Sequence, residues 1–581
     1  MKKIVSLILS LTLLLSSLAI LSSCGAKDAG AEISVYLGER IYDFDPTDYY
    51  VDSNAESVLS LLFEPLFSVN SKGKLEYAAA KKYTVDESTR TIVITLRETY
   101  WSDGVPVKAE DYIHAWSNIL LNPNDANPAA VLLYDIKNAA EIKNGSVASV
   151  FDFGAVATGT QEITINYRKG ANVDMLLKNL ASIATSPIRQ DIATDHTSGY
   201  WSKLLNSAIS NGPFMLGTLD EDENNFTLVR NTGYHQSPTA KDVTKNVTPA
   251  KLVSVFTRFG ETELTYADIE NKAVFYMSDA SLAERAAKKG SATVSDDLST
   301  YTYVFNTKNE LFKIKEVREA LSKVIDRNAI IDAITFGKAA TGFLPDSVID
   351  TNTGKKFRTE NLISTSADLN AAKALLDGVD LSGVKTEFTL TVNDDEESVA
   401  IANLVKAAWE SLGHGIKVTV KPVGYIKTTP TEGIQALDSE IQVLVNRASR
   451  GDIAFDVIAV DWQMYSTDAF VPLAAFSTEY SGSGVKLPYL DKYYGSFGGY
   501  TNAEYDDLIK SAYKESDTAK RSELLHSAEK ALVESYAVVP LVYNQNFAFV
   551  SRDLSGLTTN GFGDFVFTKV KQKNYRNYLE D

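Results

Sequence analysis

The order of apolar and polar positions alternates between strand-like and helix-like segments along most of the chain. Residues 91–96, TIVITL, alternate with a period of two after a polar turn, which predicts a strand. Residues 108–121 carry apolar side chains at helical spacing, which predicts an amphipathic helix. From residue 387 onward the expected order is strand, helix, strand, helix, strand. This order predicts an α/β fold in which right-handed crossovers join parallel strands.

The strand expected at residues 455–460, FDVIAV, is the most apolar of all. Its almost continuous apolar run is typical of a strand buried on both faces of a parallel sheet. The run ends in Asp461, Trp462 and Tyr465, and Asp468 follows among potential helix caps. Ligands of open α/β sheets bind beyond the carboxyl ends of the strands. We therefore predict that this segment forms the floor of a binding site.

The other expected elements are spread over the whole chain. Strands are expected at 33–37, 81–86, 162–167, 225–230, 251–257, 273–276, 300–306, 388–392, 416–422 and 538–543, and helices at 57–67, 314–331, 397–412, 503–515 and 519–535. A chain of 581 residues is too long for one hydrophobic core, so two or three lobes are expected.

Charge and composition narrow the class of protein. Lysine and arginine total 57 against 75 acidic residues, a formal net charge of −18. This acidic balance argues against a nucleic-acid partner, which requires a basic surface, and gives no help in docking to an anionic lipid surface. The hydrophobic content of 44% and the 29 tyrosines indicate a well-packed globular protein.

The first residues form an export signal rather than part of the fold. Lys2 and Lys3 precede an apolar segment, and Leu21-Ser22-Ser23-Cys24 follows, which resembles the lipobox of bacterial lipoproteins. The resemblance implies cleavage after residue 23 and a diacylglycerol on Cys24. A plain signal peptide or an uncleaved anchor is the alternative. Cys24 is the only cysteine, so no internal disulfide or thiolate metal site can form, and residues 24–32 are expected to be a flexible tether.

Motifs of catalysis are missing from the sequence. The five histidines are too far apart in the chain to suggest paired metal ligands, and no GxSxG, GxxxxGK[ST] or GxGxxG motif occurs. Two distant carboxylates could still serve glycoside hydrolysis. The acidic run 394–397 is better explained as a solvated helix start. We expect no catalytic residue, no metal and no cofactor.

Residues 101–111, WSDGVPVKAED, carry the strongest motif. They resemble the WSDGxPVTAxD signature of extracellular solute-binding proteins of the peptide/nickel class, family 5, which capture solutes for ABC importers. Further similar segments follow in the family's order: Phe44-Asp45-Pro46, Leu62-Phe63-Glu64-Pro65-Leu66, Asn211-Gly212-Pro213-Phe214, Arg230-Asn231, Phe305-Asn306-Thr307, Val317-Arg318-Glu319-Ala320-Leu321, Ile325-Asp326-Arg327, Asn502-Ala503-Glu504-Tyr505-Asp506, Ala528-Glu529 and Val539-Pro540-Leu541. The resemblance spans nearly the whole chain after the leader. Most motif residues are expected to be fold markers, and Arg318 and Arg327 are expected to form salt bridges.

The resemblance implies a periplasmic-binding-protein-like fold of type II, with two hinged α/β lobes and an inserted extra domain. The expected division is a leader at 1–23, a tether at 24–32, lobe I at 33–70 with 200–295 and 547–581, an inserted domain at 71–199, and lobe II at 296–546. A peptide or peptide-like ligand would be enclosed between the lobes and delivered to the permease of an ABC transporter. The resemblance also implies a monomer, anchored by lipid at the outer face of the bacterial cytoplasmic membrane.

The candidate site departs from the family pattern at one position. Peptide-binding members carry a tract that resembles GWxADYxDP, whose first aspartate neutralises the α-ammonium group of the peptide. Here Asp461-Trp462 replaces Gly-Trp, Tyr465 replaces that aspartate, and Asp468 matches the later acidic position. The amine anchor is therefore missing, unless Asp461 or Asp468 takes its place.

Three more tyrosines are candidates for the wall of the site by position, namely Tyr50, Tyr301 and Tyr303, although each could equally belong to the core. Within the family, the solute could instead be a nickel chelate, an opine or an oligosaccharide. Outside it, the fold could serve a surface lipoprotein for adhesion or sensing.

Overall fold

The computed structural model describes residues 30–39, 41, 43–47, 53–121, 127–147, 149–193, 202, 209–220, 225–257, 274–276, 290–334, 337–427, 437–449, 451–481 and 498–573. The predicted leader, Cys24 and Tyr50 lie outside these residues. The tether was expected to include residue 32, but that residue is the first of strand β1 (Glu32–Glu39). The carbonyl of Ala31 already accepts a hydrogen bond from Ala250 N at 3.0 Å, so this end of the segment belongs to the sheet.

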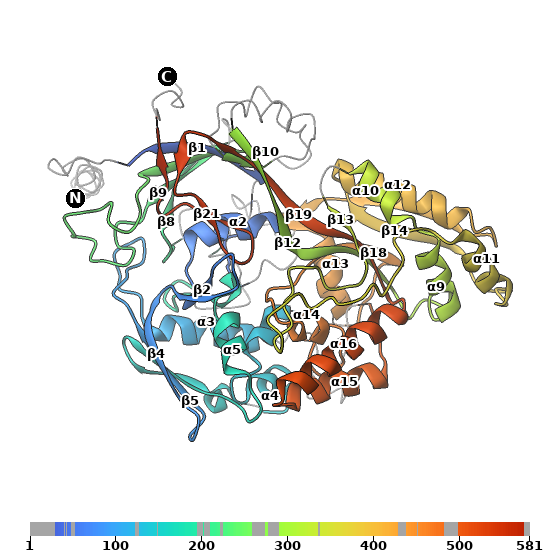
Figure 1. The fold of residues 1–581 in the computed structure, drawn as a ribbon, viewed down its shortest axis with the longest axis horizontal. Coiled ribbons are helices and arrows are strands. Elements are labelled where there is room, and N and C mark those ends of the chain that lie inside the picture. Colours follow the sequence, from blue (N-terminus) through green and yellow to red (C-terminus); the bar gives the residue numbers. More distant parts are fainter. Residues whose placement is uncertain are drawn as a thin grey trace, which may run out of the picture.

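Eleven strands of the described chain form one sheet. Its order is β15 (Lys417–Val423), β14 (Glu387–Asn393), β18 (Val457–Gln463), β12 (Gly290–Phe305), β19 (Val538–Ser551), β11 (Val274–Tyr276), β1, β10 (Lys251–Thr257), β9 (Asn225–Arg230) and β8 (Phe214–Asp220), and β13 (Lys338–Ala339) pairs with β19. We call the part around β1 and β8–β11 lobe I, and the part around β13–β15 and β18 lobe II. Figure 1 shows the two parts on either side of the molecule.

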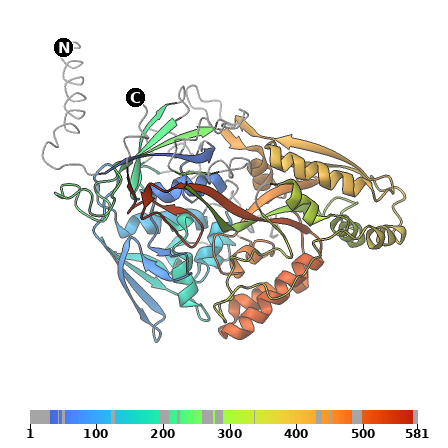
Figure 2. The same cartoon turned by 45° about the horizontal axis from the view of Figure 1, so that its top comes forward.

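Two long strands, β12 and β19, join the lobes. In lobe I, β12 pairs with β19 from Gly290 to Asp296, and in lobe II from Thr300 to Val304. The register shifts between Asp296 and Thr300, which is a bulge at the boundary of the lobes. Figures 1 and 2 show β19, in red, running through the middle of the molecule from one lobe to the other. The sequence predicted only residues 300–306 and 538–543 of these two strands, because polar side chains interrupt both apolar patterns.

The core of lobe II is built around Trp409. This indole is fully buried on α12 (Glu396–Glu410), and its Nε1 donates to the carbonyl of Leu321 at 2.8 Å. Its ring contacts those of Tyr303, Phe305 and Phe388. The helices α9 (Lys315–Lys323), α10 (Arg327–Ala333) and α11 (Leu369–Asp377) complete this lobe. A single core of aromatic and branched side chains thus holds these helices on one face of the sheet.

The helix expected over residues 314–331 is two helices. Asp326 ends the first apolar stripe and caps α10, because its carboxylate accepts hydrogen bonds from Asn328 N at 3.0 Å and Ala329 N at 3.2 Å. An aspartate at an N-cap stabilises a new helix start better than it continues an old one.

Neither Arg318 nor Arg327 forms the expected salt bridge with any residue that the structure describes. Arg318 donates to the carbonyls of Phe312 and Ser535, and Arg327 donates to that of Pro540 at 2.7 Å. Burial without a carboxylate lowers the pKa of Arg327 to about 10. Both arginines therefore fasten loops through backbone carbonyls rather than through ion pairs.

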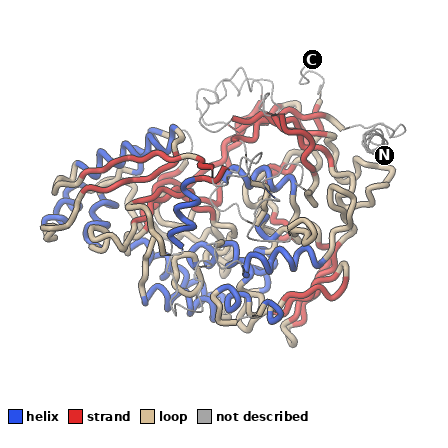
Figure 3. Tube along the Cα trace, turned by 180° about the vertical axis from the view of Figure 1, so that it is seen from behind, coloured by secondary structure: helices blue, strands red, loops and turns tan. Residues whose placement is uncertain are grey.

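A second sheet, of four described strands, lies at the far edge of lobe I. Its order is β4 (Ala80–Asp86), β5 (Thr91–Leu96), β7 (Glu162–Asn166) and β6 (Ala155–Gly159). The helices beside it are α3 (Ala109–Leu121), α4 (Ala139–Lys143), α5 (Val173–Asn179) and the 3₁₀ turn η1 (Pro128–Leu133). Figure 3 shows these strands at the edge of the molecule remote from α12. We call this part the inserted region.

The motif residues hold segments of lobe I and of the inserted region in place. Within lobe I, Asn211 accepts a hydrogen bond from Glu64 N and donates to Glu64 O, both at 2.9 Å. Asn231 donates to the carbonyl of Tyr100 at 3.2 Å, and the Trp101 indole donates to Asp111 at 3.0 Å. These contacts support the expectation that the motifs mark the fold rather than the ligand.

Candidate ligand-binding site

The strand β18 runs further than its apolar pattern predicts, through Asp461 and Trp462 to Gln463. It is also not a strand of a purely parallel sheet, since it pairs antiparallel with β12 and parallel with β14. The antiparallel pairing with β12 covers Val457 to Gln463. The pairing with β14 covers only Val457 and Ile458. Within the described chain, β18 beyond Ile458 therefore has no strand partner on its β14 side.

Asp461 and Trp462 lie on opposite faces of the sheet because successive side chains of a strand alternate. Asp461 is paired with Tyr301 and shares its face with Ala459 and the core of lobe II. Trp462 shares the other face with Val460 and the larger core cluster. The sequence suggested that the two residues lie together on one floor, but the structure places them on opposite faces. They flank the open edge of β18 from its two sides.

Asp461 is half-buried and hydrogen-bonded to a neutral partner. The amide of Asn544 donates to its carboxylate at 2.8 Å and to the Ser299 hydroxyl at 2.8 Å. Desolvation raises the pKa of Asp461 to about 6; the Asn544 hydrogen bond opposes this, and Asp395 and Asp297 add to it. No cationic side chain of the described chain forms an ion pair with Asp461, so its negative charge is uncompensated there.

Trp462 is 8% exposed and packs against two phenylalanine rings that also contact each other. Its ring centroid lies 4.8 Å from that of Phe476 and 6.1 Å from that of Phe343. Aromatic neighbours at these distances hold the indole in one orientation.

Tyr465 adopts a left-handed backbone conformation with φ 57° and is 5% exposed. A residue other than glycine with positive φ is uncommon and marks a sharp turn. The flanking backbone and side chains are fixed: Met464 N donates to Leu298 O at 3.0 Å, and the Ser466 hydroxyl donates to Asn179 Oδ1 of α5 at 2.5 Å. The loop after β18 therefore turns abruptly toward the inserted region.

Asp468 has a buried cationic partner. Arg521, on α16 (Thr518–Glu534), donates to its two carboxylate oxygens at 3.1 and 2.7 Å. The side chain of Asp468 is 4% exposed and that of Arg521 is 8% exposed. Asp468 also accepts from Phe470 N at 3.2 Å, at the start of α14 (Phe470–Ala474). Its charge is thus balanced within the protein.

The two tyrosines on β12 lie in the core of lobe II. Tyr303 is fully buried, and its ring lies 6.0 Å from that of Trp409. Tyr301 is 5% exposed, its ring centre lies 5.8 Å from that of Tyr303, and its buried hydroxyl forms no hydrogen bond with the part of the chain that the structure describes. Desolvation raises the pKa of both hydroxyls. Tyr301 lies beside Asp461, whereas Tyr303 lies one pair further into the core.

The sequence reasoning missed the polar residues at the lobe boundary. Asp297 is bonded to Ser299 and accepts from Asn546 at 3.2 Å, and Asn544 connects Ser299 to Asp461. The available signal was the polar runs at 295–300 and 543–546 within strand-like segments. Two cavities among the described residues lie away from this network, one beside Glu64 and His235 and one beside Arg318 and Tyr500.

Lobe II also contacts the inserted region directly. The Tyr513 hydroxyl, on α15 (Ala503–Lys514), donates to Tyr134 O at 3.0 Å. The guanidinium of Arg168 lies 3.7 Å from the centre of the Tyr513 ring, and Arg168 is paired with Asp135. With the Ser466–Asn179 hydrogen bond, these contacts connect lobe II to the inserted region without involving β12 and β19.

Two α/β lobes that share one sheet through a pair of continuous strands define a binding protein of the periplasmic type II class. A family model for bacterial extracellular solute-binding proteins, family 5 Middle, matches residues 74–484. The chain therefore belongs to this family and is a solute-binding protein, not an enzyme.

Relatives match over nearly the full length. The oligopeptide-binding protein OppA of Bacillus subtilis (strain 168) is 24% identical over 576 residues, 96% of this chain and 97% of that protein. The periplasmic murein peptide-binding protein MppA of Escherichia coli (strain K12) is 26% identical over 526 residues, 88% of each chain. A solved structure of the pheromone receptor PrgZ covers 94% of this chain and 100% of its own, with a TM-score of 0.75 at 22% identity, and shows the same fold.

None of the helices that the structure describes is long and apolar enough to cross a membrane. The described residues also contain no group of three histidine, cysteine, aspartate or glutamate side chains that could hold a metal ion.

The buried pair of Asp468 and Arg521 yields a stability prediction. Arg521→Met should lower the free energy of unfolding by about 3–5 kcal/mol, because it leaves the Asp468 carboxylate buried without its partner. The matched control is Arg447→Met, which removes the exposed pair with Asp452 and should cost less than about 1 kcal/mol. Urea unfolding of the purified protein measures both, and equal losses would show that Asp468 does not depend on Arg521.

Proposed function

We propose that the protein is a lipid-anchored substrate-binding protein of an ABC transporter, which captures peptides or peptide-like solutes between its lobes and delivers them to a membrane permease. The observation that carries this proposal is the open edge of β18 beyond Ile458, flanked by Asp461 and Trp462 at the lobe boundary. An exposed strand edge offers main-chain donors and acceptors in the spacing of an extended peptide.

Most of the named relatives favour a peptide, whereas one, the probable deoxycholate-binding periplasmic protein YgiS of Escherichia coli (strain K12), is 24% identical and named for another solute. OppA and MppA are named as peptide-binding proteins, and the reported solved structure is described with its mode of peptide binding. Main-chain pairing is independent of the peptide's side chains, and ordered waters can fill the space that shorter side chains leave. A site of this kind accepts many sequences of similar length.

Asp461 is our choice for the anchor of the ligand's amine. The position that carries the amine-binding aspartate in peptide-binding members is Tyr465 here, and Asp468 is neutralised by Arg521. Asp461 has only the neutral amide of Asn544 as a partner. A ligand ammonium group would supply the positive charge that this half-buried carboxylate needs as a partner. Asp395, whose charge acts on Asp461, makes the surroundings more negative.

Closure would use β12 and β19 as the hinge. These strands connect the lobes within the sheet. The bulge after Asp296 interrupts the hydrogen bonds between them, so a small rotation of one lobe against the other would break few hydrogen bonds there. The contacts of Tyr513 and Ser466 hold lobe II against the inserted region in this structure. They would break when the lobes open.

The leader supports the proposed anchoring. A diacylglycerol on Cys24, after cleavage of residues 1–23, would hold the protein at the outer face of the cytoplasmic membrane. The short segment from Cys24 to β1 would leave the binding lobes close to the permease.

The indole at the edge of β18 can be tested by truncation. Trp462→Ala should weaken the binding of a short peptide by at least ~30-fold, about 2 kcal/mol, because a buried aromatic contact is lost. Isothermal titration with a pool of short synthetic peptides measures the change, and Trp462→Phe, which keeps a ring between Phe343 and Phe476, should retain most of the affinity. Unchanged affinity in Trp462→Ala would place the site elsewhere.

The amine anchor predicts a dependence on pH and on acetylation. Peptides with a free amino terminus should bind about tenfold more tightly than their N-acetylated forms at pH 7, since only the free amine pairs with Asp461. The raised pKa of about 6 means that Asp461 is charged at pH 7 and mostly protonated at pH 5, whereas the amine stays protonated throughout. The affinity for free peptides should therefore fall about tenfold between pH 7 and pH 5.

The control is Asp461→Asn, which keeps the shape of the side chain and removes its negative charge. This variant should bind free and acetylated peptides alike and lose the pH dependence. Equal binding of both peptides by the unaltered protein would rule out Asp461 as the anchor without affecting the assignment to peptides.

A further inference from the structure

A cationic pocket lies on lobe II, apart from the open edge of β18. Its cavity volume is about 650 Å³, and its walls come from residues 307–318, residues 499–508 and the last turns of α16. Its charged side chains are five cations and two carboxylates, namely Lys308, Lys313, Lys315, Arg318, Lys530, Glu504 and Glu534. This excess of positive charge stands out on a chain with a net charge of −18.

The pocket is at the opposite end of β18 from Asp461. Asn306 N donates to Asp456 O at 2.9 Å just before β18 begins, and Thr307 N donates to Gly498 O at 2.9 Å beside the pocket. A solute bound near Asp461 is therefore separated from this pocket by the length of the strand, so the two sites are distinct.

Arg318 supplies a buried charge without a carboxylate partner. Its guanidinium is bonded to the carbonyl of Ser535 at 3.1 and 2.8 Å and to that of Phe312 at 2.5 Å, and the residue is 8% exposed. No carboxylate of the described chain forms an ion pair with it. Carbonyl oxygens satisfy the donors of a guanidinium but do not neutralise its charge.

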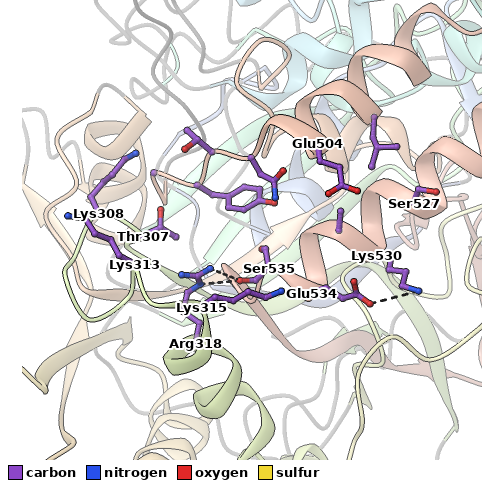
Figure 4. A pocket seen from close by; sticks show the side chains of 16 residues that line it. Thr307, Lys308, Lys313, Lys315, Arg318, Glu504, Ser527, Lys530, Glu534 and Ser535 are labelled. Atoms are coloured by element: carbon purple, nitrogen blue, oxygen red, sulfur yellow. Dashed lines mark hydrogen bonds and ion pairs between the residues drawn. The ribbon is translucent and has the colours of Figure 1, made fainter. Parts of the chain in front are cut away.

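Lys315 adds a second cation at the start of α9. Figure 4 shows its side chain passing Arg318 and reaching toward Glu534. Ile314 is the N-cap of this nine-residue helix and contributes no capping hydrogen bond, so the first backbone N–H groups of α9 have no side-chain acceptor. The partial positive charge of a helix start favours an anion beside it.

Tyr500 provides an independent sign of a missing ligand. It lines the pocket, is 6% exposed, and its hydroxyl is buried without a hydrogen-bond partner in the described structure. Burial raises the pKa of this hydroxyl to about 12, and the neighbouring side chains of Ser535 and Asn502, followed by the charge of Arg318, act on the pKa in the opposite direction. A buried hydroxyl that lacks a partner costs free energy unless a ligand supplies one.

We propose that this pocket is a binding site for a phosphate group, held by Lys315, Arg318 and the Tyr500 hydroxyl at the amino end of α9. The three side chains and the helix start offer hydrogen-bond donors, and a phosphate group at neutral pH is anionic and offers several strong acceptor oxygens. The phosphate group could belong to a soluble phosphate ester or to the headgroup of a phospholipid. The proposal does not depend on the solute that binds at Asp461.

Inorganic phosphate is the first probe, in titration calorimetry of the protein without its leader. We expect saturable binding at one site, weakened about tenfold in Lys315→Gln, which removes a positive charge, and several-fold in Tyr500→Phe, which removes the hydroxyl donor. The matched control is Lys373→Gln on α11, which removes an exposed positive charge from the same lobe and should leave the affinity unchanged. Lys315 is exposed, so its substitution should not disturb folding.

Two outcomes would overturn the proposal. They are the lack of saturable phosphate binding in the unaltered protein, and equal affinities in Lys315→Gln and Lys373→Gln. A second experiment separates the sources of phosphate. If vesicles of phosphatidylcholine with phosphatidylglycerol bind the protein through Lys315, the ligand is a headgroup; if glycerol phosphate binds through Lys315 and the vesicles do not, the ligand is a soluble ester.

Discussion

The pairing of β12 with β19 is the constraint on which the rest of the structure depends. The two strands carry the sheet of lobe I into lobe II, and every other strand is placed on one side of their bulge. The polar side chains near this bulge also reach the candidate site, because Asn544 of β19 bonds both Ser299 and Asp461. Asp461 is therefore one hydrogen-bonded residue, Asn544, away from the proposed hinge. We propose that ligand binding at Asp461 and lobe closure are coupled through this short connection.

The buried charged side chains differ in their partners, and this difference is our basis for separating structural residues from candidate ligand-binding residues. Asp468 is paired with Arg521, and Arg327 is satisfied by backbone carbonyls that fasten neighbouring segments. Asp461 has a single neutral amide, and Arg318 has carbonyls beside a cationic pocket. These two residues carry charge that the described chain does not neutralise. On this ground we propose a cationic ligand group for Asp461 and an anionic one for Arg318.

Much of the fold follows from the periodicity of the sequence, and its limits have physical causes. The strand at 91–96 and the helix at 397–412 follow from side-chain alternation and from helical spacing, and both are confirmed within two residues. The helix expected at 314–331 was wrong because the N-cap preference of Asp326 outweighs the continuing apolar stripe. The length of β19 was missed because its polar residues at 543–546 serve the lobe boundary, not the core.

The candidate site was only partly predictable. The polar end of β18 was visible in the sequence, but the alternation that separates Asp461 from Trp462 required the strand to continue beyond its apolar run. The pairing of Asp468 with Arg521 joins residues 53 positions apart in the chain, which no local pattern reveals.

The central claim is that an extended ligand adds to the open edge of β18. Hydrogen exchange of the intact protein, followed by mass spectrometry with and without a pool of short peptides, tests it most directly. The account predicts that the peptides slow exchange in the segment 459–465 and in the boundary segments of β12 and β19. Protection confined to lobe I, or no protection of the β18 segment by peptides that bind, would contradict it.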